Sequence, residues 1–255
     1  MSLFDLTGKV AVVTGSSRGI GEAIAIQLAA HGARVVVSSR KIDACQAVVD
    51  KIDAAHGKGR AIAVAANISS KEALQGLVDQ THKAFGGIDI LVCNAASNPH
   101  YGSMSTLGDD AFNKVLGNNI VSNHWLIQMV VPEMTRRRDG AIIIISSVAG
   151  LKGSPTIGAY GISKAADMQL ARNLAVELGP HNIRVNCIAP GIIKTEFARA
   201  LWEDQKVMER VHSVTPLRRI GDPDEIAGAA VFLASPAGAF MTGNTIVIDG
   251  GATII

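Results

Sequence analysis

The sequence predicts an α/β protein, a doubly wound parallel sheet with helices on both faces, in a single domain over residues 1–255. Three observations lead to this fold. Short runs of valine and isoleucine alternate with longer helical patterns along the whole chain. No linker-like, repeated or low-complexity stretch interrupts the alternation. Hydrophobic residues make up 48% of the chain and charged residues 18%, which fits a well-buried core.

The first predicted strand, 9–14, is a short valine-rich run followed by a glycine loop that reads Gly15-Ser16-Ser17-Arg18-Gly19-Ile20-Gly21. An alanine-rich helix, 22–31, comes next. Glycines permit a tight turn and a close approach of backbone to phosphate, and the helix N-terminus presents free N–H groups. The spacing G-x-x-x-G-x-G differs from the commoner G-x-G-x-x-G. Because the loop joins a strand to a helix, we expect it to bind a dinucleotide.

The second predicted strand, 34–38, ends in Ser39-Arg40-Lys41. At this position NAD enzymes usually carry an acidic side chain that holds the adenosine ribose. Arg40 can instead pair with a 2′-phosphate, and Arg18 can approach the same group. We therefore expect NADP(H) to be preferred and NAD(H) to remain possible. The alternative is that Arg40 begins the next helix and faces solvent.

Strands and helices continue to alternate through the rest of the chain. The remaining predicted elements are a helix over 42–56, a strand over 60–65, a helix over 71–85, a strand over 88–93, a long helix over 110–134, a strand over 142–145, a helix that carries Tyr160 and Lys164 and ends at 178, a strand over 183–188, a helix over 222–234 and a strand over 245–248. Ligands of open α/β sheets bind at the carboxyl ends of the strands. The loop residues Asn67 and Ile68 are placed to flank an adenine, and the small residues after Asn94 allow a cofactor to approach.

A candidate for chemistry lies between residues 141 and 165, where a strand of four isoleucines leads through Ser147 to a helix with Tyr160 and Lys164. Positions i and i+4 share a helix face, so phenol and ammonium can converge. A cation about 4 Å away, at an effective dielectric near 20, favours phenolate by about 4 kcal/mol before desolvation. Tyr160 can then act as a general acid or base, with Ser147 bonded to the same substrate oxygen. The alternative is a half-buried tyrosine beside a surface lysine.

Two further segments have predicted roles. The long helix contains Asn119, which we expect beside Lys164, holding a water that links the lysine to solvent. The segment 196–214 is amphipathic and bounded by loop signals, as expected of a lid over a substrate pocket at about 194–216. Its apolar positions are Phe197, Leu201, Trp202 and Val207. Ordinary core packing is the alternative for this segment.

Composition argues against several classes of function. The net charge is +2, and the one basic tract, Arg136–Arg138, reads as a solvated helix end, so we expect no nucleic-acid partner. The seven histidines show no ligand spacing, so no metal site is predicted. The three cysteines are far apart and read as buried thiols of a reducing compartment. No apolar run reaches about 18 residues and the sequence MSLFDLTGK lacks an apolar signal region, so we expect a cytoplasmic protein without a membrane segment.

Together these motifs resemble the short-chain dehydrogenase/reductase family, whose fold is Rossmann-like. The resemblance covers essentially the whole chain and rests on Thr14-Gly-x-x-x-Gly-Ile-Gly21, Asn94-Ala-Ala, Asn119, Ser147, Tyr160-x-x-x-Lys164 and Pro190-Gly191. More narrowly, the stretches 35–41, 98–102, 130–134 and 173–197 look like the NADP-dependent carbonyl and retinal reductases of animal peroxisomes. The last residues, Ala252-Thr253-Ile254-Ile255, do not resemble a Ser-Lys-Leu tripeptide, so no peroxisomal address is expected.

The resemblance implies a catalytic set, a cofactor and an assembly. Tyr160 handles the substrate proton, Lys164 lowers its pKa and holds the nicotinamide ribose, Ser147 orients the carbonyl and Asn119 carries a proton relay. The residues expected at the cofactor are Gly15, Ser17, Arg18, Gly19, Ile20, Gly21, Ser39, Arg40, Asn67, Ile68, Asn94, Ala95, Tyr160, Lys164, Pro190, Gly191, Ile193 and Thr195. Related proteins are commonly tetramers, so a homotetramer is expected. Three residues depart from the family pattern, namely Ser39, Asn67 and Ser97.

The expected function is NADP(H)-dependent reduction of a small ketone or aldehyde to an alcohol, in a reversible reaction. One alternative is a β-ketoacyl thioester reductase, whose acidic carrier protein would dock on Arg136–Arg138 or on Arg218 and Arg219. An enoyl reductase is disfavoured, because that branch spaces its tyrosine and lysine more widely. The alternative from another class is an inactive dinucleotide-sensing protein, although such proteins typically lose the tyrosine or the lysine.

Overall fold

The computed structural model describes residues 2–255, with the side chains of Ala200, Leu201 and Arg210 outside the described part. Its centre is a seven-stranded sheet in the order β3-β2-β1-β4-β5-β6-β7, and every ladder that joins these strands is parallel. The strands are β1 Val10–Thr14, β2 Arg34–Ser39, β3 Ala61–Ala65, β4 Ile90–Cys93, β5 Gly140–Ile145, β6 Ile183–Pro190 and β7 Thr245–Ile248. The predicted doubly wound α/β fold is confirmed.

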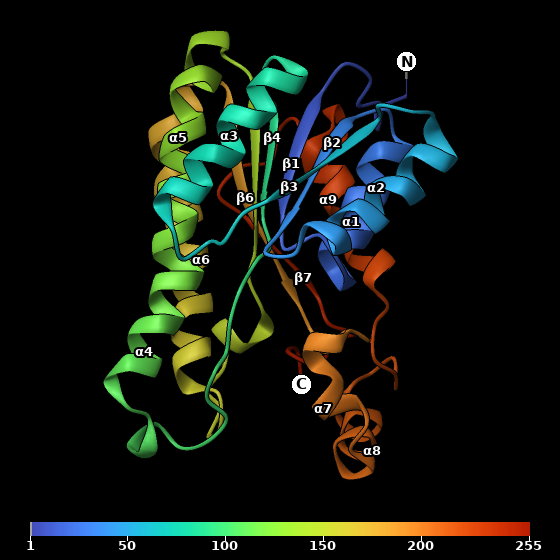
Figure 1. Ribbon diagram of the computed structural model, residues 1–255. Helices are drawn as coiled ribbons and strands as arrows, with labels where there is room; N and C mark the ends of the chain where they lie inside the picture. Colours follow the sequence, from blue (N-terminus) through green and yellow to red (C-terminus); the bar gives the residue numbers. More distant parts are fainter. Residues whose placement is uncertain (1) are drawn as a thin grey trace.

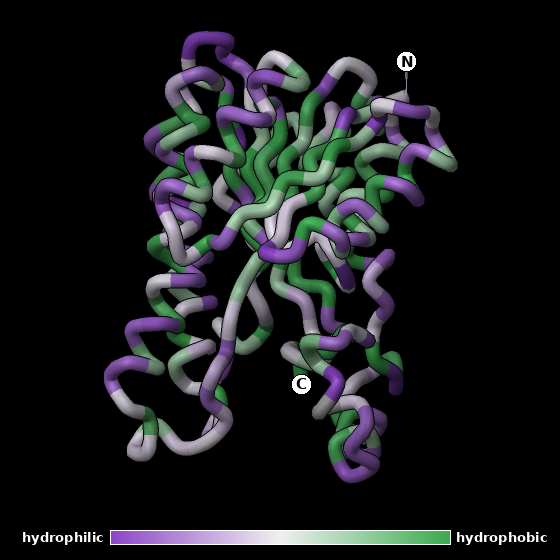
Figure 2. Tube along the Cα trace, in the orientation of Figure 1, coloured by the Kyte–Doolittle hydropathy of each residue, from purple (hydrophilic) through white to green (hydrophobic). Residues whose placement is uncertain are grey.

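Helices cover both faces of the sheet (Figure 1). The helices are α1 Gly19–Ala30, α2 Ile42–His56, α3 Lys71–Phe85, α4 Asp109–Leu116, α5 Ser122–Arg137, α6 Gly158–Leu178, α7 Arg199–Trp202, α8 Gln205–Val214 and α9 Pro223–Ala234. One buried cluster joins α1, α2 and α9 to strand residues such as Val13. A second joins α3, α5 and α6 to residues such as Val12. Successive strand residues therefore enter opposite cores, which is why the strands read as continuous apolar runs (Figure 2).

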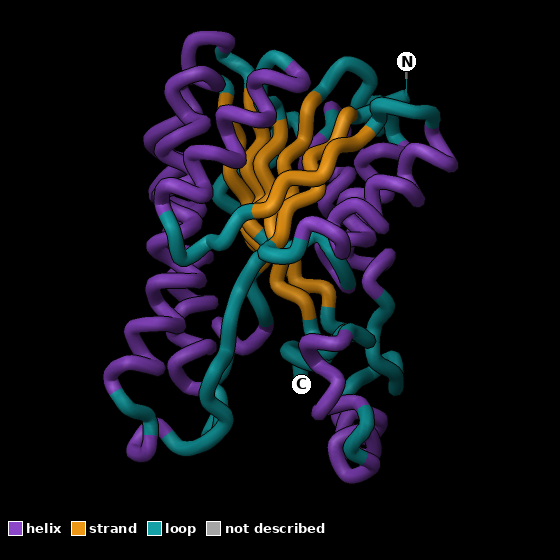
Figure 3. Tube along the Cα trace, in the orientation of Figure 1, coloured by secondary structure: helices purple, strands orange, loops and turns teal. Residues whose placement is uncertain are grey.

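The strand order reverses between β1 and β4, because β2 and β3 extend the sheet on one side of β1 and β4 to β7 on the other. In open α/β sheets this switch point lies beneath the ligand site. The loops and short helices 94–108 and 194–216, with α4, extend beyond the carboxyl ends of the strands (Figures 1 and 3). The fold therefore gathers at one edge most of the segments to which the sequence assigns function.

The long helix predicted over 110–134 is divided in the structure. α4 passes at Gly117–Val121 into a π-helical turn, and α5 continues from Ser122. Asn118 and Asn119 lie in this turn and are buried. Single π turns inside α-helices are frequent at functional sites, because they re-aim side chains without ending the helix.

The segment expected to be amphipathic contains more than one helix. A short turn at Glu196–Ala198 leads into α7, and α8 begins after Asp204. The Asp204 carboxylate accepts hydrogen bonds from the backbone N–H groups of Lys206 and Val207, a typical N-cap that starts a new helix. Leu201, expected on the apolar face, has a side chain outside the described part.

Candidate active site

The glycine loop is packed tightly against the segment that follows β4. Gly15 has φ +65°, and a Cβ on it would lie 2.9 Å from Ala95 Cα. A Cβ on Gly21 would lie 2.5 Å from both Asn94 Nδ2 and the Gly15 carbonyl oxygen. Asn94 Nδ2 donates to the carbonyl oxygens of Thr14 and Gly15, at 2.9 and 3.1 Å. The close packing against Asn94 and Ala95 therefore requires glycine at both positions and holds the loop in a tight turn before α1, as in dinucleotide-binding loops.

Thr195, from the segment after β6, reaches the same loop. A Cβ on Gly19, which has φ +61°, would lie 3.2 Å from Thr195 Cγ2. Ser17 and Ile20 flank Gly19 and are half-buried. Three segments far apart in the sequence therefore meet at the start of α1, where the free N–H groups of the helix point outward.

The residues expected at the adenosine end lie along one edge of the sheet. Ser16 donates its backbone N–H to the Ser38 carbonyl at 3.1 Å, and Ala66 donates to the Ser39 carbonyl at 2.9 Å. These contacts place Arg18, Ser39 and Arg40 on neighbouring segments, with Asn67 and Ile68 directly beyond. Arg18 and Arg40 are exposed, and within residues 2–255 neither has an ion-pair partner. Both guanidinium groups are available to an anion.

Tyr160 and Lys164 lie within the first two turns of α6, and Lys164 Nζ is 5.6 Å from the centre of the Tyr160 ring. The lysine is 2% exposed and donates to the Ile145 carbonyl at 2.8 Å and to Asp167 Oδ2 at 2.9 Å. Burial works against its charge. The carboxylate of Asp167 and then Tyr160 outweigh that effect and raise the pKa of Lys164 above its ordinary value. Lys164 is thus held as an ammonium beside the phenol.

Ser147 follows β5 and starts the short turn Val148–Gly150, with its Oγ accepting from the Ala149 N–H at 3.1 Å. This turn packs closely on α6. A Cβ on Gly161 would lie 2.7 Å from the Ala149 carbonyl oxygen, and one on Gly150 would lie 2.6 Å from the Ala165 nitrogen. The close approach fixes Ser147 relative to the helix that carries Tyr160.

Asn119 is fully buried and is held by the segment after β4. Its Oδ1 accepts from the Ser97 N–H at 2.8 Å, and its Nδ2 donates to the Ser97 carbonyl at 3.1 Å and to Ser163 Oγ at 3.0 Å. The side chain therefore bonds the residue before Lys164 and not the ammonium itself. Ser97, a departure from the family pattern, also accepts from Asn118 Nδ2 at 2.9 Å, which anchors this segment to the π turn.

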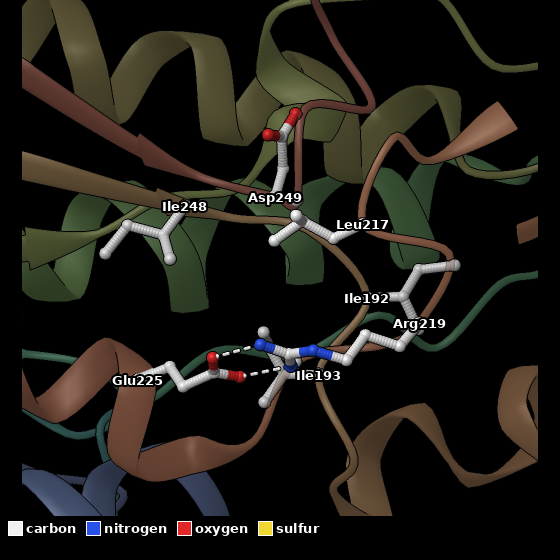
Figure 4. Close-up of a pocket in the computed structure, with 9 residues that line it drawn as sticks. Ile192, Ile193, Leu217, Arg219, Glu225, Ile248 and Asp249 are labelled. Carbon is white, nitrogen blue, oxygen red and sulfur yellow. Dashed lines mark hydrogen bonds and ion pairs between the residues drawn. The ribbon is translucent and has the colours of Figure 1, made fainter. Parts of the chain in front are cut away.

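The remaining candidates follow β6 and lie near β7. A Cβ on Gly191, next to Pro190, would lie 2.8 Å from Asp249 Cα, and Ile193 pairs with Gly221 in an isolated bridge. A small cavity of about 70 Å³ is lined by Ile193 and by the ion-paired Arg219 and Glu225, whose side chains Figure 4 shows. Ile193 is 4% exposed, so its side chain packs inside the protein and anchors the segment after β6.

The sequence predicted no role for two buried polar residues, Asp167 and Asn123. Asp167 is 0% exposed, and Asn123 Nδ2 donates to its Oδ1 at 3.1 Å. Burial raises the pKa of Asp167, and the Lys164 ammonium opposes this effect. The available signal was a carboxylate at i+3 from Lys164, on an otherwise apolar face of the predicted helix.

Within residues 2–255, no group of three or more side chains is arranged to hold a metal ion. No helix of this part of the chain combines the length and the apolar character that crossing a membrane requires.

Comparison with known proteins identifies the family. A family model described as enoyl-(acyl carrier protein) reductase matches residues 15–253. "Dehydrogenase/reductase SDR family member 4" of Bos taurus is 43% identical and its human counterpart 42%, over 97% and 96% of this chain and 88% of each relative. These relatives agree with the narrower resemblance to animal reductases.

Two solved structures are similar over nearly the whole chain. A 7α-hydroxysteroid dehydrogenase in complex with NADH and 7-oxo glycochenodeoxycholic acid is 38% identical, with TM-score 0.93, over 98% of this chain and 96% of that one. A gluconate 5-dehydrogenase from Burkholderia cenocepacia in complex with NADP and tartrate is 31% identical, with TM-score 0.93, over 99% and 98%. The chain therefore belongs to the short-chain dehydrogenase/reductase family and is an oxidoreductase that interconverts carbonyl and alcohol groups with a nicotinamide dinucleotide.

Proposed function

We propose that this enzyme reduces a small ketone or aldehyde to an alcohol with NADPH, reversibly, and that Tyr160 is its acid–base residue. The observation that carries the proposal is the buried ammonium of Lys164, held 5.6 Å from the Tyr160 ring. The tight glycine loop of Gly15, Gly19 and Gly21 at the start of α1 supports a site for the phosphates of the dinucleotide. When bound there, the dinucleotide supplies or accepts the hydride.

The side chains around Tyr160 then divide the remaining work. In reduction, Tyr160 gives its proton to the substrate oxygen, and the adjacent ammonium stabilises the phenolate that remains. Ser147 Oγ accepts a hydrogen bond from Ala149, so its own hydrogen is free to bond the same oxygen. Two of the three Lys164 hydrogens are engaged, which leaves one for the nicotinamide ribose. Asn119 fixes the segment after β4 against α6.

The preference for NADP(H) is supported by the two unpaired guanidinium groups of Arg18 and Arg40 and by the absence of an acidic side chain at Ser39. A 2′-phosphate at this end of the sheet would gain charge-assisted hydrogen bonds that the diol of NAD(H) cannot make. NAD(H) is the weaker cofactor in this proposal.

Replacing Tyr160 with phenylalanine removes the phenolic proton and keeps the ring. Turnover of a carbonyl panel should fall by about 100- to 10,000-fold, the usual contribution of a general acid or base. NADPH binding, followed by the fluorescence of the bound dinucleotide, should stay within about twofold of the wild type and serves as the control. Undiminished turnover in the variant would refute the proposal.

A β-ketoacyl thioester is the competing substrate class. Its acidic carrier protein would dock on basic side chains, and ion pairs already occupy some of the candidates. Of the basic side chains considered for carrier docking, Arg137 pairs with Asp89 and Glu133, and Arg219 pairs with Glu225. Each patch thus has one arginine whose charge is already paired. A panel of free ketones, aldehydes and β-ketoacyl thioesters separates the two classes directly, and NADPH binding without any turnover would point to the sensing protein instead.

The segment 194–216 is part of this proposal as a lid over the substrate. Phe197 lies beyond β6 with its ring centre 6.2 Å from that of Tyr160, and the Trp202 indole donates to the Thr195 carbonyl at 2.8 Å. In this proposal the lid brings Phe197 to the substrate and joins it to the cofactor segment at Thr195. A homotetramer and a location in the cytoplasm stay predictions of the sequence.

A further inference from the structure

Asp167 is a buried carboxylate that the roles given above do not use. Its side chain is 0% exposed and lies on α6, three residues after Lys164. Aspartate is almost never fully buried without a partner, because the loss of hydration must be offset by charge or hydrogen bonds. The contacts of this carboxylate therefore indicate what it does.

Both oxygens of Asp167 are engaged around the Lys164 ammonium. Oδ2 accepts from Lys164 Nζ at 2.9 Å, and Oδ1 accepts from Asn123 Nδ2 at 3.1 Å. The Asn123 amide also donates to the Asn119 carbonyl at 2.7 Å, so the carboxylate is tied to the π turn. Together with the Ile145 carbonyl, Asp167 fixes the position of an ammonium that is 5.6 Å from the Tyr160 ring.

We propose that Asp167 is a positioning residue that orients Lys164 and cancels part of its charge at Tyr160, so that the acid–base pair works at higher pH. The ammonium and the carboxylate form a pair without net charge, and the field of such a pair on a third group is weaker than that of a lone cation. Loss of the Tyr160 proton, which alcohol oxidation requires, therefore needs a higher pH. This inference rests on the proposed role of Tyr160.

The direction of the effect follows from the coupled titration of Lys164 and Tyr160. Alcohol oxidation needs the state of this pair that has released one proton. A neighbouring negative charge disfavours that release, whichever of the two groups gives up the proton. Removal of the Asp167 charge must therefore lower the pH at which the pair loses its first proton.

Among the described residues, few other titratable groups face Lys164 and Tyr160. The thiols of Cys93 from β4 and Cys187 from β6 are both in its electrostatic environment. Burial raises the pKa of both thiols, that of Cys187 to about 12, so neither changes its charge in a profile from about pH 5 to 10. On the side of α5 and of the lid, the contacts are the neutral side chains of Asn123 and Phe197.

The chain contains only two tyrosines, which permits a direct test. Tyr101 is 67% exposed, and Tyr101→Phe leaves Tyr160 as the one phenol that titrates. In this background, the phenolate absorbance of Tyr160 should appear about one pH unit lower with Asp167→Asn than without it. Asp167→Glu, which keeps the charge, should restore the higher value. An unchanged or raised titration midpoint in Asp167→Asn, together with an unmoved acid limb in the kinetic profile, would overturn the proposal, because a raised midpoint alone is also what loss of the Lys164 proton before that of Tyr160 would give.

Kinetics give a second readout on the enzyme with Tyr101 in place. In Asp167→Asn, the acid limb of the pH profile of kcat/KM for alcohol oxidation should shift to a pH about one unit lower. At the acid end of the limb, kcat/KM divided by its plateau value should therefore be roughly tenfold higher than in the wild type. Glu177→Gln removes an exposed carboxylate from the same helix and should leave the limb in place. A limb that moves equally in both variants would mean that net charge, and not Asp167, sets it.

Two controls keep the inference separable from the proposed function. Should the buried amide of Asp167→Asn unfold the protein, Asp167→Leu removes the same charge with an apolar side chain, and thermal melting and NADPH binding establish that it is folded. Full turnover in Tyr160→Phe would remove the proposed function. Loss of turnover in Tyr160→Phe together with an unmoved limb in Asp167→Asn would remove the inference alone.

Discussion

At the scale of single residues, the two important cations of this enzyme occupy opposite environments. Lys164 is 2% exposed and is fixed by a carbonyl oxygen and a carboxylate. Arg40 is exposed and has no partner in the described chain. A buried ammonium keeps one geometry and acts on a neighbour through its field. An exposed guanidinium remains free to bind an incoming phosphate in two parallel hydrogen bonds.

Arg40→Ala tests the second of these environments. Because a hydrogen bond to a charged group contributes about 1.5–3 kcal/mol, kcat/KM with NADPH should fall about 10- to 100-fold. Initial rates with NADH should stay nearly constant, since the ribose diol does not need the cation. Arg136→Ala, which removes an exposed arginine of α5, is the matched control. Equal losses with both cofactors would show that Arg40 does not read the 2′-phosphate.

At the scale of elements, the beginning of α9 is stabilised by an ion pair and a capping box that share one carboxylate. Glu225 accepts from Arg219 at 2.6 and 2.7 Å and from the Asp222 N–H at 2.8 Å, and it completes a capping box with Asp222. Arg219 first, and then the Asp222 N–H, lower the pKa of Glu225 from 4.5 to about 2. The carboxylate is thus stabilised in the folded state relative to the unfolded chain.

Glu225→Gln should lower the melting temperature at pH 7 by about 1–3 °C, because it removes the charge that pairs with Arg219. The decrease is small because this ion pair is exposed and screened by solvent. A lowered folded-state pKa contributes stability above the unfolded value of 4.5, and this contribution is lost as the pH falls from there towards about 2. The difference between variant and wild type should therefore narrow below about pH 4.5. Differential scanning at pH 7 and pH 4 measures it, with Glu177→Gln as the control. A difference that widens on acidification would contradict this account.

Elements with strong local signals were predicted to the residue. The helix over Lys71–Phe85 starts where Ser70 accepts from the Ala73 N–H and ends at Gly86 with φ +86°. The π turn at Asn119 was missed, because nothing in the local apolar pattern distinguishes it from a continuing α-helix. Asp204, which divides the lid, carries a cap signal that the amphipathic pattern masked.

The candidate site was foreseen where chemistry has a fixed spacing, as for Tyr160 and Lys164. Its support was not. Asp167 lies three residues after Lys164 on α6, so their contact is local, but its burial depends on the packing of that face of α6 against α5 and β6, which a local pattern does not show. Ser97 bonds Asn119 across 22 positions of sequence. Such long-range polar contacts require the fold to be known first.

At the scale of the whole molecule, the single chain leaves apolar side chains uncovered. Val176 of α6 is 82% exposed and Ile162 is 47% exposed, and Phe240 is fully exposed. The homotetramer expected from the family pairs the helices that carry Asn119 and Lys164. Exposed apolar side chains on α6 fit an interface of this kind.

Light scattering should give a mass near four times that of the 26.6 kDa chain. Val176→Glu places a charge on the exposed face of α6 and should shift the mass towards dimers or monomers, because an unpaired charge in an interface is costly. Leu3→Glu, at another exposed apolar side chain, should leave the assembly intact. A wild-type mass of one chain would rule the tetramer out.

The arrangement of the sheet separates two kinds of selectivity along the chain. The glycine loop and the end of β2, which we expect to face the cofactor, lie before residue 42, whereas 98–108 and 196–216 extend beyond the carboxyl ends of the strands, and Phe197 of the second segment lies near Tyr160. The buried strands between them belong to neither. Evolution can therefore exchange the outer segments for new ones, and so recruit the enzyme to other carbonyl compounds, while its hydride donor stays the same.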